Sequence, residues 1–371
     1  MRFFLRSLMA VLAAAPMVGP AHADIKIGVA GPLTGPNAAY GQQYLAGVQA
    51  AADKINSAGG ILGEKLVVIS GDDASDPKQG VAVANHFVSD GIKFVVGHYN
   101  SGVTIPSSEV YAENSIVFVT PTATNPMVTD RGLWNAFRAC GRDDQQGSIA
   151  GKFVLDRFKD KKIAIVDDKS TAGKGLADEM RKAFVAGGGK PVLVEEINPG
   201  EKDYSALVSK IKASRADLLY YGGQHTEAGL IVRQMRDQGV NTVLMGGDGI
   251  SNSEFASIGG PGAEGTLMTS FPDPATHPEA KDVVADLAAR KVPQEAVTLY
   301  AYAATQIIAS AISKAGKADT KAVASYLHSG AAVPTVLGPI SYDKKGDIEQ
   351  PGFVAFEWKV VDGKLTPVEL K

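Results

Sequence analysis

Hydroxyl-bearing side chains follow two short apolar segments in the first third of the chain. Residues 93–97 lead into Ser101, and residues 116–120 lead into Thr122 and Thr124. In an open parallel sheet, the loops that leave the carboxyl ends of neighbouring strands lie at the crevice where ligands bind. Hydroxyls and backbone N–H groups near a helix start bind a carboxylate well. These two segments therefore predict one half of a polar pocket.

An acidic residue follows another strand-like segment much later in the chain. Residues 242–245 are apolar or β-branched, and Asp248 follows them between glycines. A carboxylate can bind an ammonium group. If the two strand ends face each other across a cleft, Ser101, Thr124 and Asp248 suit a small zwitterion. Singly, each has a simpler role, because Ser and Thr often cap helices and Asp is a common turn residue.

Three tyrosines could form the remaining wall of such a pocket. Tyr40 follows the first strand and its loop, Tyr99 lies beside Ser101, and Tyr300 lies in a late helical segment. Each of them could equally cover the hydrophobic core, because tyrosine has an apolar body and a polar tip.

The motifs of common catalytic and cofactor sites are missing from the sequence. Lys174 is followed by glycine where a phosphate-binding loop needs Ser or Thr, and residues 28–31 lack the third glycine of a dinucleotide-binding turn. Ser101 has only His98 nearby, and nothing places that histidine as its base. No histidine beyond residue 23 has a metal-ligand spacing. We therefore expect neither an enzyme, nor a cofactor, nor a metal.

The first 23 residues have the features of a cleaved signal peptide. Arg2 and Arg6 precede an apolar stretch, and residues 21–23 read Ala-His-Ala. We expect the mature chain to begin at Asp24 and to be exported to the periplasm. The apolar stretch is too short to span a membrane, and we expect no later segment to be long enough.

The totals suggest two ordinary globular domains. The 371 residues exceed the usual size of a single core. A formal net charge of −3 argues against a nucleic-acid partner. Cys140 is the only cysteine, so no intrachain disulfide can form. We expect it to be a small packed residue rather than a reactive thiol.

From residue 25 onward, short β-branched segments alternate with amphipathic helices. This alternation predicts βα units on parallel sheets. A helix followed by a glycine pair and a strand occurs at residues 58–60 and again at 186–188, which favours two similar α/β halves. Helices dominate from residue 279 to 327, and we expect them to return to the first half. A hairpin with its turn at Asp362 and Gly363 should supply edge strands.

Several segments at ordered spacing resemble the periplasmic leucine/isoleucine/valine-binding proteins, which serve ABC importers of the branched-chain amino acid type. The resemblance covers nearly the whole mature chain. It rests on the following segments: Gly31-Pro32-Leu33-Thr34-Gly35, Gly59-Gly60-Ile61-Leu62-Gly63, Asp72-Asp73 with Asp76-Pro77-Lys78-Gln79, Gly97-His98, Thr120-Pro121-Thr122-Ala123-Thr124, Tyr221-Gly222-Gly223 and the run from Gly338 to Asp343.

The resemblance implies an α/β type I periplasmic-binding fold, with two Rossmann-like lobes of parallel sheets joined by three hinge crossings. The crossings are expected near residues 141–142, 271–272 and 351–352. The N-lobe would comprise residues 24–141 and 272–351, and the C-lobe residues 142–271 and 352–371. Such a protein would be a monomeric periplasmic receptor that closes on a small free amino acid, branched-chain or small neutral, and delivers it to the permease subunits of an ABC importer.

The resemblance also assigns roles within the pocket. Residues matching Ser101 and Thr124 hold the α-carboxylate, and the carbonyl of Thr122 and the acid at Asp248 take the ammonium. Tyr40 and Tyr99 match positions that contact the ligand side chain. The expected ligand-binding set is Tyr40, Tyr99, Asn100, Ser101, Thr122, Ala123, Thr124, Gln224, Asp248 and Tyr300.

The chain departs from the branched-chain pattern at several pocket positions. The family disulfide, whose cysteines match Ser75 and Asn100, is missing, and Gln224 and Ala172 replace two tyrosines. Tyr99 is bulkier than the usual aliphatic residue. These departures favour small neutral amino acids such as alanine, proline or γ-aminobutyrate. An amide, a urea or a small aromatic carboxylate is the alternative ligand on the same fold.

Overall fold

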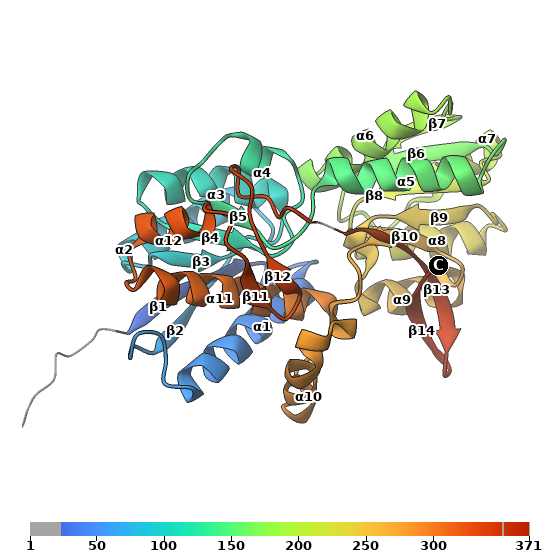
Figure 1. The fold of residues 1–371 in the computed structure, drawn as a ribbon. Coiled ribbons are helices and arrows are strands. Elements are labelled where there is room, and N and C mark those ends of the chain that lie inside the picture. Colours follow the sequence, from blue (N-terminus) through green and yellow to red (C-terminus); the bar gives the residue numbers. More distant parts are fainter. Residues whose placement is uncertain (1–23, 351, 371) are drawn as a thin grey trace, which may run out of the picture.

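The computed structural model describes residues 24–350 and 352–370. The expected signal peptide lies outside these residues. Two lobes lie side by side, each built around its own β-sheet (Figure 1). We call the lobe with the five-stranded sheet the N-lobe and the lobe with the seven-stranded sheet the C-lobe.

The N-lobe sheet has the strand order β2-β1-β3-β4-β5, and all of its pairs are parallel. Its strands are β1 (Ile25–Gly31), β2 (Leu66–Asp72), β3 (Phe94–Val96), β4 (Val117–Thr120) and β5 (Ala136–Arg138). The sequence patterns predicted the first four of these strands. Strand β5 was not anticipated, because Arg138 interrupts its apolar pattern.

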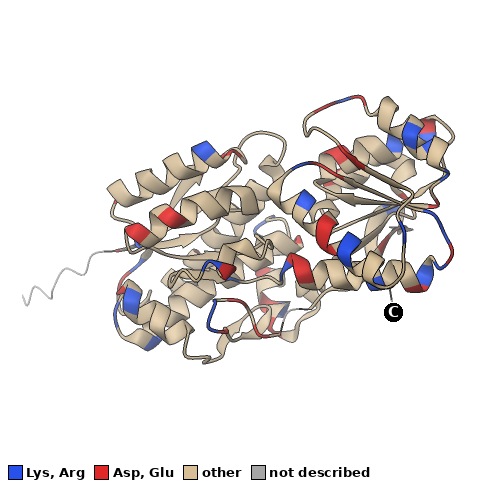
Figure 2. Ribbon diagram, turned by 90° about the horizontal axis from the view of Figure 1, so that it is seen from above, with Lys and Arg blue, Asp and Glu red and all other residues tan. Residues whose placement is uncertain are grey.

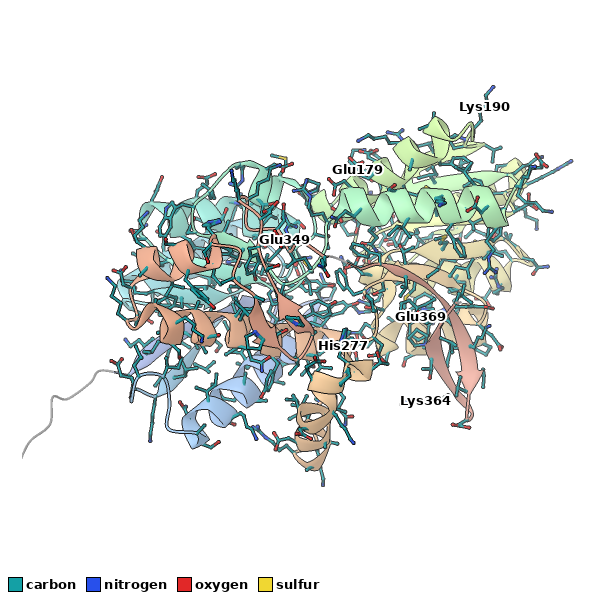
Figure 3. The ribbon with its side chains drawn as sticks, viewed as in Figure 1. Glu179, Lys190, His277, Glu349, Lys364 and Glu369 are labelled. Carbon is teal, nitrogen blue, oxygen red and sulfur yellow. The ribbon has the colours of Figure 1, made fainter. Side chains whose placement is uncertain are left out.

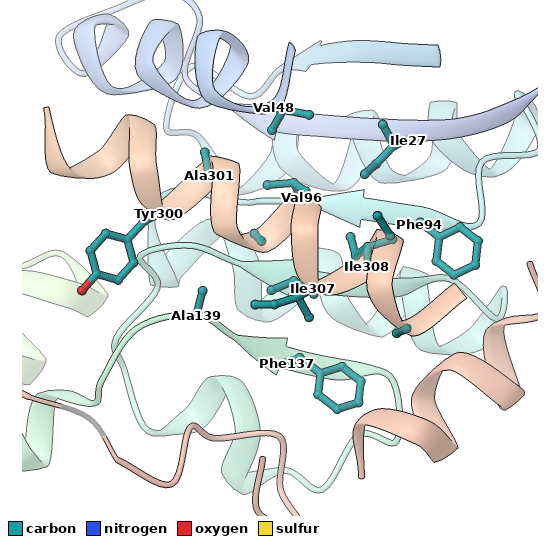
Figure 4. Close-up of a cluster of buried hydrophobic side chains, with 14 of the residues drawn as sticks. Ile27, Val48, Phe94, Val96, Phe137, Ala139, Tyr300, Ala301, Ile307 and Ile308 are labelled. Atoms are coloured by element: carbon teal, nitrogen blue, oxygen red, sulfur yellow. The ribbon is translucent and has the colours of Figure 1, made fainter. Parts of the chain in front are cut away.

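Helices cover both faces of the N-lobe sheet. They are α1 (Ala38–Ser57), α2 (Pro77–Ser89), α3 (Ser101–Glu113), α4 (Met127–Asp130), α10 (Lys281–Ala289), α11 (Ala296–Ala315) and α12 (Thr320–Leu327). Alternate residues of one strand serve the two faces: Phe94 and Val96 pack with α1 and α11, whereas Val95 packs with α2 and α3. Figure 4 shows the first of these clusters.

Asp76 followed by Pro77 is the sequence pattern of a helix start, and the structure of α2 confirms this prediction. The Asp76 carboxylate accepts hydrogen bonds from the backbone N–H groups of Lys78 and Gln79, and Pro77 occupies the first turn. The polar residues after the strand at residues 93–97 predict a helix that starts near Thr104. The observed helix α3 begins three residues earlier, at Ser101. This shift brings Ser101 itself into the first turn of a helix, where free backbone N–H groups gather.

The C-lobe sheet has the order β14-β13-β10-β9-β8-β6-β7. Its strands are β6 (Ile163–Asp167), β7 (Leu193–Glu196), β8 (Leu218–Gly222), β9 (Val243–Gly246), β10 (Leu267–Ser270), β13 (Val354–Val361) and β14 (Lys364–Glu369). The predicted hairpin turn at residues 362–363 joins the last two strands, which are antiparallel and lie at the sheet edge. The remaining pairs are parallel.

The C-lobe sheet is also covered on both faces. Its helices are α5 (Asp143–Arg157), α6 (Thr171–Ala186), α7 (Ser205–Ser214), α8 (His225–Asp237) and α9 (Ser253–Gly259). Leu218 and Tyr220 pack against α5 and α6, while Leu219 and Tyr221 pack against α7 and α8. Acidic and basic residues are dispersed over both lobes (Figure 2).

The chain passes between the two sheets in three places. The first lies between β5 and α5, and the second follows β10, where a short helix at Pro274–Thr276 packs on α11. The third lies between the small N-lobe hairpin, β11 (Val333–Thr335) and β12 (Gly338–Ile340), and β13. Glu349 and His277 mark this region between the lobes in Figure 3. The three crossings implied by the resemblance fall within these segments, so we retain the stated lobe boundaries as a proposal.

Helix α11 corrects the expectation that no later segment could span a membrane. Its 20 residues are long and apolar enough to do so by length and composition. However, most of the helix is buried in the N-lobe core, where Ile307 and Ile308 pack against the sheet. A helix that is apolar nearly all round is what the centre of a large core requires.

Candidate ligand-binding site

A cavity lies between the lobes, at the carboxyl ends of strands from both sheets. Its volume is about 430 Å³, including its opening to solvent. The N-lobe lines it with Tyr99, Asn100, Ser101, Thr122 and Thr124, and the C-lobe lines it with Asp143, Ala172, Gly173, Leu176, Gly223, Gln224, Asp248 and Gly249. Seven of the ten predicted site residues are therefore brought together, although they are scattered over about 150 positions of sequence.

The N-lobe wall is neutral and rich in hydroxyls. Ser101 is buried at the start of α3, and its Oγ accepts a hydrogen bond of 3.2 Å from the backbone N–H of Asn125. The Thr122 hydroxyl donates to the carbonyl of Tyr99 at 3.2 Å and shares a 2.6 Å hydrogen bond with the Tyr44 hydroxyl. These bonds hold the loops after β3 and β4 against each other. They give the wall a fixed shape before any ligand arrives.

Arg138 supports this wall from beneath. Its guanidinium is fully buried and donates to the backbone carbonyls of Ala123 at 2.7 Å and Asn125 at 3.2 Å. Asp347 pairs with it at 2.7 Å. The side chain of Ala123 points into the N-lobe core and does not line the cavity, which corrects its predicted place in the site. Its backbone is instead the point at which Arg138 holds the loop.

A stack of aromatic rings closes one side of the cavity. The Tyr99 hydroxyl donates to Oε1 of Gln224 across the two lobes at 2.9 Å. Tyr40 stacks on Tyr99 with ring centroids 4.6 Å apart, and its hydroxyl donates to the carbonyl of Gly249 at 3.1 Å. Tyr40 therefore lies behind Tyr99 rather than in the cavity lining, contrary to the sequence prediction.

The C-lobe wall carries two carboxyl groups, the buried Asp143 and the half-buried Asp248. Asp248 follows β9, and burial raises its pKa to about 6, while the side chain of Gln146 partly offsets this effect. Asp143 is the first residue of α5, and burial raises its pKa to about 7, with a further contribution from the charge of Asp248. Among the described residues, no Lys or Arg lines the cavity. The wall therefore offers strong acceptors for a cationic group.

Glycines let the C-lobe elements approach this closely. A Cβ atom at Gly173, at the start of α6, would lie 2.2 Å from Oδ1 of Asp168 and 2.6 Å from the carbonyl of Gly222. Any side chain at this position would therefore push α6 away from the end of β8 and open the cavity wall.

Comparison with known proteins identifies the family. Residues 24–363 match the model of a family described as periplasmic binding proteins. This chain belongs to that family.

Curated relatives and a solved structure agree with this assignment. A protein of Brucella melitensis named Leu/Ile/Val-binding protein homolog 1 is 50% identical over 100% of both chains. The Leu/Ile/Val-binding protein BraC3 of Rhizobium johnstonii is 50% identical over 98% of both. A solved structure of the branched-chain amino acid transporter substrate-binding protein LivJ of Streptococcus pneumoniae, in complex with isoleucine, is 26% identical. It superimposes with a TM-score of 0.83 and covers 94% of this chain and 100% of that one.

As expected for a periplasmic binding protein with two lobes, further contacts cross the cleft outside the cavity. The Asn125 side chain donates to the carbonyl of Thr171 at 3.1 Å, and the Ser253 hydroxyl donates to Glu295 at 2.9 Å. Together with the Tyr99–Gln224 and Tyr40–Gly249 bonds, these contacts hold the cleft in a closed form.

Tyr300 contributes to a second cavity at the hinge instead of the first. Its ring extends from the start of α11, away from Ile307 and Ile308 (Figure 4), and packs on Phe271 with ring centroids 4.9 Å apart. This cavity is also lined by Gly141, Pro272 and Gly352, which belong to the three crossings. The prediction that Tyr300 walls the ligand cavity is therefore wrong for this structure, because its ring lies at the hinge cavity and packs against Phe271.

Sequence reasoning missed Asp143, Gly173, Leu176, Gly223 and Gly249. Asp143 follows Arg142 at the start of a helix, where acidic residues are common for local reasons, so nothing in its pattern marks it as a cavity residue. The glycines and Leu176 are visible only once the two lobes are placed. Cys140 is buried as expected, and burial raises the pKa of its thiol. Within the described part of the chain, no cluster of three or more potential metal ligands occurs.

Proposed function

We propose that this protein is an exported receptor that closes on one free amino acid and delivers it to an ABC importer. The observation that carries the proposal is the opposed chemistry of the two walls. The hydroxyls of Ser101 and Thr124 and the first turn of α3 suit a carboxylate, whereas Asp248 on the other lobe suits an ammonium group. The relatives named Leu/Ile/Val-binding proteins support an amino acid as the ligand.

Within the amino acids, we propose a small neutral ligand rather than leucine. The Tyr99–Gln224 hydrogen bond spans the cleft, and Tyr99 matches a position that, by the resemblance, contacts the ligand side chain. A ligand that breaks this bond would have to compensate for two buried polar groups left without partners. Alanine, proline and γ-aminobutyrate avoid that cost because they are compact.

Isothermal titration calorimetry tests both parts of the proposal. The mature protein, from Asp24 onward, should bind at least one amino acid with a micromolar or lower Kd, and alanine, proline or γ-aminobutyrate should bind more tightly than leucine. If none of the common amino acids and γ-aminobutyrate binds, the proposed function is contradicted. Tighter binding of leucine would contradict only the size preference.

The alternative ligand class is an amide, a urea or a small aromatic carboxylate. The structure gives a reason to rank it second, because benzoate lacks a cation and would leave Asp143 and Asp248 unpaired beside its own charge. Competition between benzoate and alanine in the same titration separates the two classes. The bound molecule should leave the protein unchanged in mass, because the proposal assigns binding without turnover.

Export and oligomeric state complete the proposal. Intact mass spectrometry of a periplasmic extract should find a chain that begins at Asp24, and sedimentation should find a monomer. A retained leader would contradict cleavage after Ala23.

A further inference from the structure

The cavity holds more negative charge than one zwitterion can neutralise. Asp143 and Asp248 both line it, and no Lys or Arg among the described residues does so. An amino acid brings one ammonium group and one further carboxylate. If every group were ionised, three negative charges would share one positive charge in a buried space. Such an arrangement is strongly unfavourable, and buried acids in this situation bind a proton instead.

Asp143 is the more deeply buried of the two acids. It is 1% exposed, and neither of its carboxylate oxygens makes a hydrogen bond of good geometry to the described residues. By contrast, Asp248 is supported by the Gln146 side chain and by backbone N–H groups at its own turn. The single positive charge of the ammonium group can balance only one of the two carboxylates. Asp248, with the better support, is the natural ionised partner.

The charged neighbours of Asp143 also favour its protonated form. The charged groups that face it are Asp248 from the turn after β9, Arg138 from β5, and Asp144 next to it on α5. Arg138 is the one cation of this group, and its guanidinium is already paired with Asp347 at 2.7 Å. The carboxylates of Asp248 and Asp144 both oppose a charge on Asp143.

The remaining neighbours of Asp143 are uncharged. Tyr220 lies beneath it on β8 and is itself fully buried, and the Thr124 hydroxyl on the N-lobe only partly offsets its burial. The N-terminus of α5 favours a negative charge, but burial outweighs this effect and raises the pKa of Asp143 to about 7.

We propose that Asp143 carries a proton in the closed, liganded site, so that the receptor takes up one proton when it binds its amino acid. The neutral carboxyl then serves as an additional hydrogen-bond donor beside the ligand. This inference rests on the proposed function, because the charge count assumes a zwitterion.

Linkage fixes the sign of the pH dependence. If opening of the cleft exposes Asp143 to water, its pKa there is the ordinary value of about 3.9, whereas burial in the closed cleft raises the pKa to about 7. The protonated form is thus favoured by closure. The affinity is highest near pH 4 and falls about tenfold per pH unit as the pH rises toward 7. Below about pH 4 it falls again, because Asp248 must be ionised to pair with the ammonium group. Above pH 7 it levels off, because the acid is then ionised in both forms.

Calorimetry at pH 5.5 in two buffers with different ionisation enthalpies counts the protons directly. Alanine binding to the wild-type protein should take up about one proton. Asp143→Asn should bind alanine at pH 7 at least as tightly as the wild type and should take up close to none. Asp168→Asn is the matched control, because Asp168 is also a buried C-lobe acid with a raised pKa, about 6, but lies outside the cavity. It should behave as the wild type.

Three results would overturn the inference while leaving the function intact. They are alanine binding without proton uptake, uptake that persists in Asp143→Asn, and uptake that disappears in Asp168→Asn. If Asp143→Asn does not fold, the wild-type affinity between pH 5 and 6.5 decides: a tenfold fall per unit supports the proposal, and a flat profile overturns it. Absence of binding to any amino acid at any pH would instead reject the proposed function itself.

Discussion

The two walls of the cleft are built from equivalent parts of similar sheets, yet they differ in charge. Both follow the carboxyl ends of parallel strands: β3 and β4 in the N-lobe, and β8 and β9 in the C-lobe. The N-lobe wall presents hydroxyls and backbone N–H groups and contains no charged side chain, whereas the C-lobe wall presents two acids. The two walls therefore differ in charge, so the proposed zwitterion would bind in one orientation, with its carboxylate toward the N-lobe.

The two walls also differ in the hydrogen bonds that fix their polar side chains. In the N-lobe, hydroxyls are already fixed by internal bonds, as in the Ser101–Asn125 contact. In the C-lobe, Asp143 lacks such bonds. The first wall is therefore preorganised, while the second depends on the ligand and a proton to balance its charge.

Removal of the Asp248 carboxylate should weaken ligand binding more than any other single change. Asp248→Ala leaves a desolvated ammonium group unpaired, so we expect a loss of at least ~2 kcal/mol in binding free energy, about 30-fold in Kd. Calorimetry with the best amino acid measures this loss. Asp178→Ala, at a half-exposed position on α6, should leave Kd unchanged. A loss of only a few tenths of a kcal/mol for Asp248→Ala would remove that residue from the site.

Substitutions in the neutral N-lobe wall should weaken binding less than the loss of Asp248. Ser101→Ala removes one hydroxyl from a charged partner, for which about 1.5–3 kcal/mol is typical, and we expect the lower end because the backbone N–H groups of α3 remain. Ser107→Ala is the control, since Ser107 lies buried in the same helix with an unpartnered hydroxyl outside the cavity. Equal effects of the two substitutions on Kd would show that Ser101 acts only through helix stability.

The contact that joins the two walls should matter least. Tyr99→Phe removes its hydrogen bond to Gln224, which should weaken binding of alanine by about 0.5–1.5 kcal/mol, because closure loses one net hydrogen bond. Gln224→Leu should have a similar cost, and the double variant should lose much less than the sum of the two. Full additivity in the titration would mean that the two side chains do not act as a pair. Leucine binding should suffer less than alanine binding.

The sequence alone determined the repeating units of this protein. The alternation of β-branched segments with amphipathic helices predicted most strands and the Asp76 cap, because these features depend on neighbours within a few residues. It also predicted that Ser101, Thr124 and Asp248 line one cavity, since strand ends of parallel sheets gather at one edge. The sequence pattern was sufficient to predict an element wherever the interactions that stabilise it join residues close together in the chain.

Tertiary structure decided the rest, because the deciding contacts join residues far apart in the chain. The place of Tyr300 depends on where α11 meets the hinge, and Tyr40 lies behind Tyr99 because the two rings stack between lobes. Asp143 looks in the sequence like any acidic residue in the first turn of a helix. Only its burial opposite Thr124 and beside Asp248 makes it part of the site, because the desolvation that shifts its pKa is produced by the assembled cleft and not by its sequence neighbours.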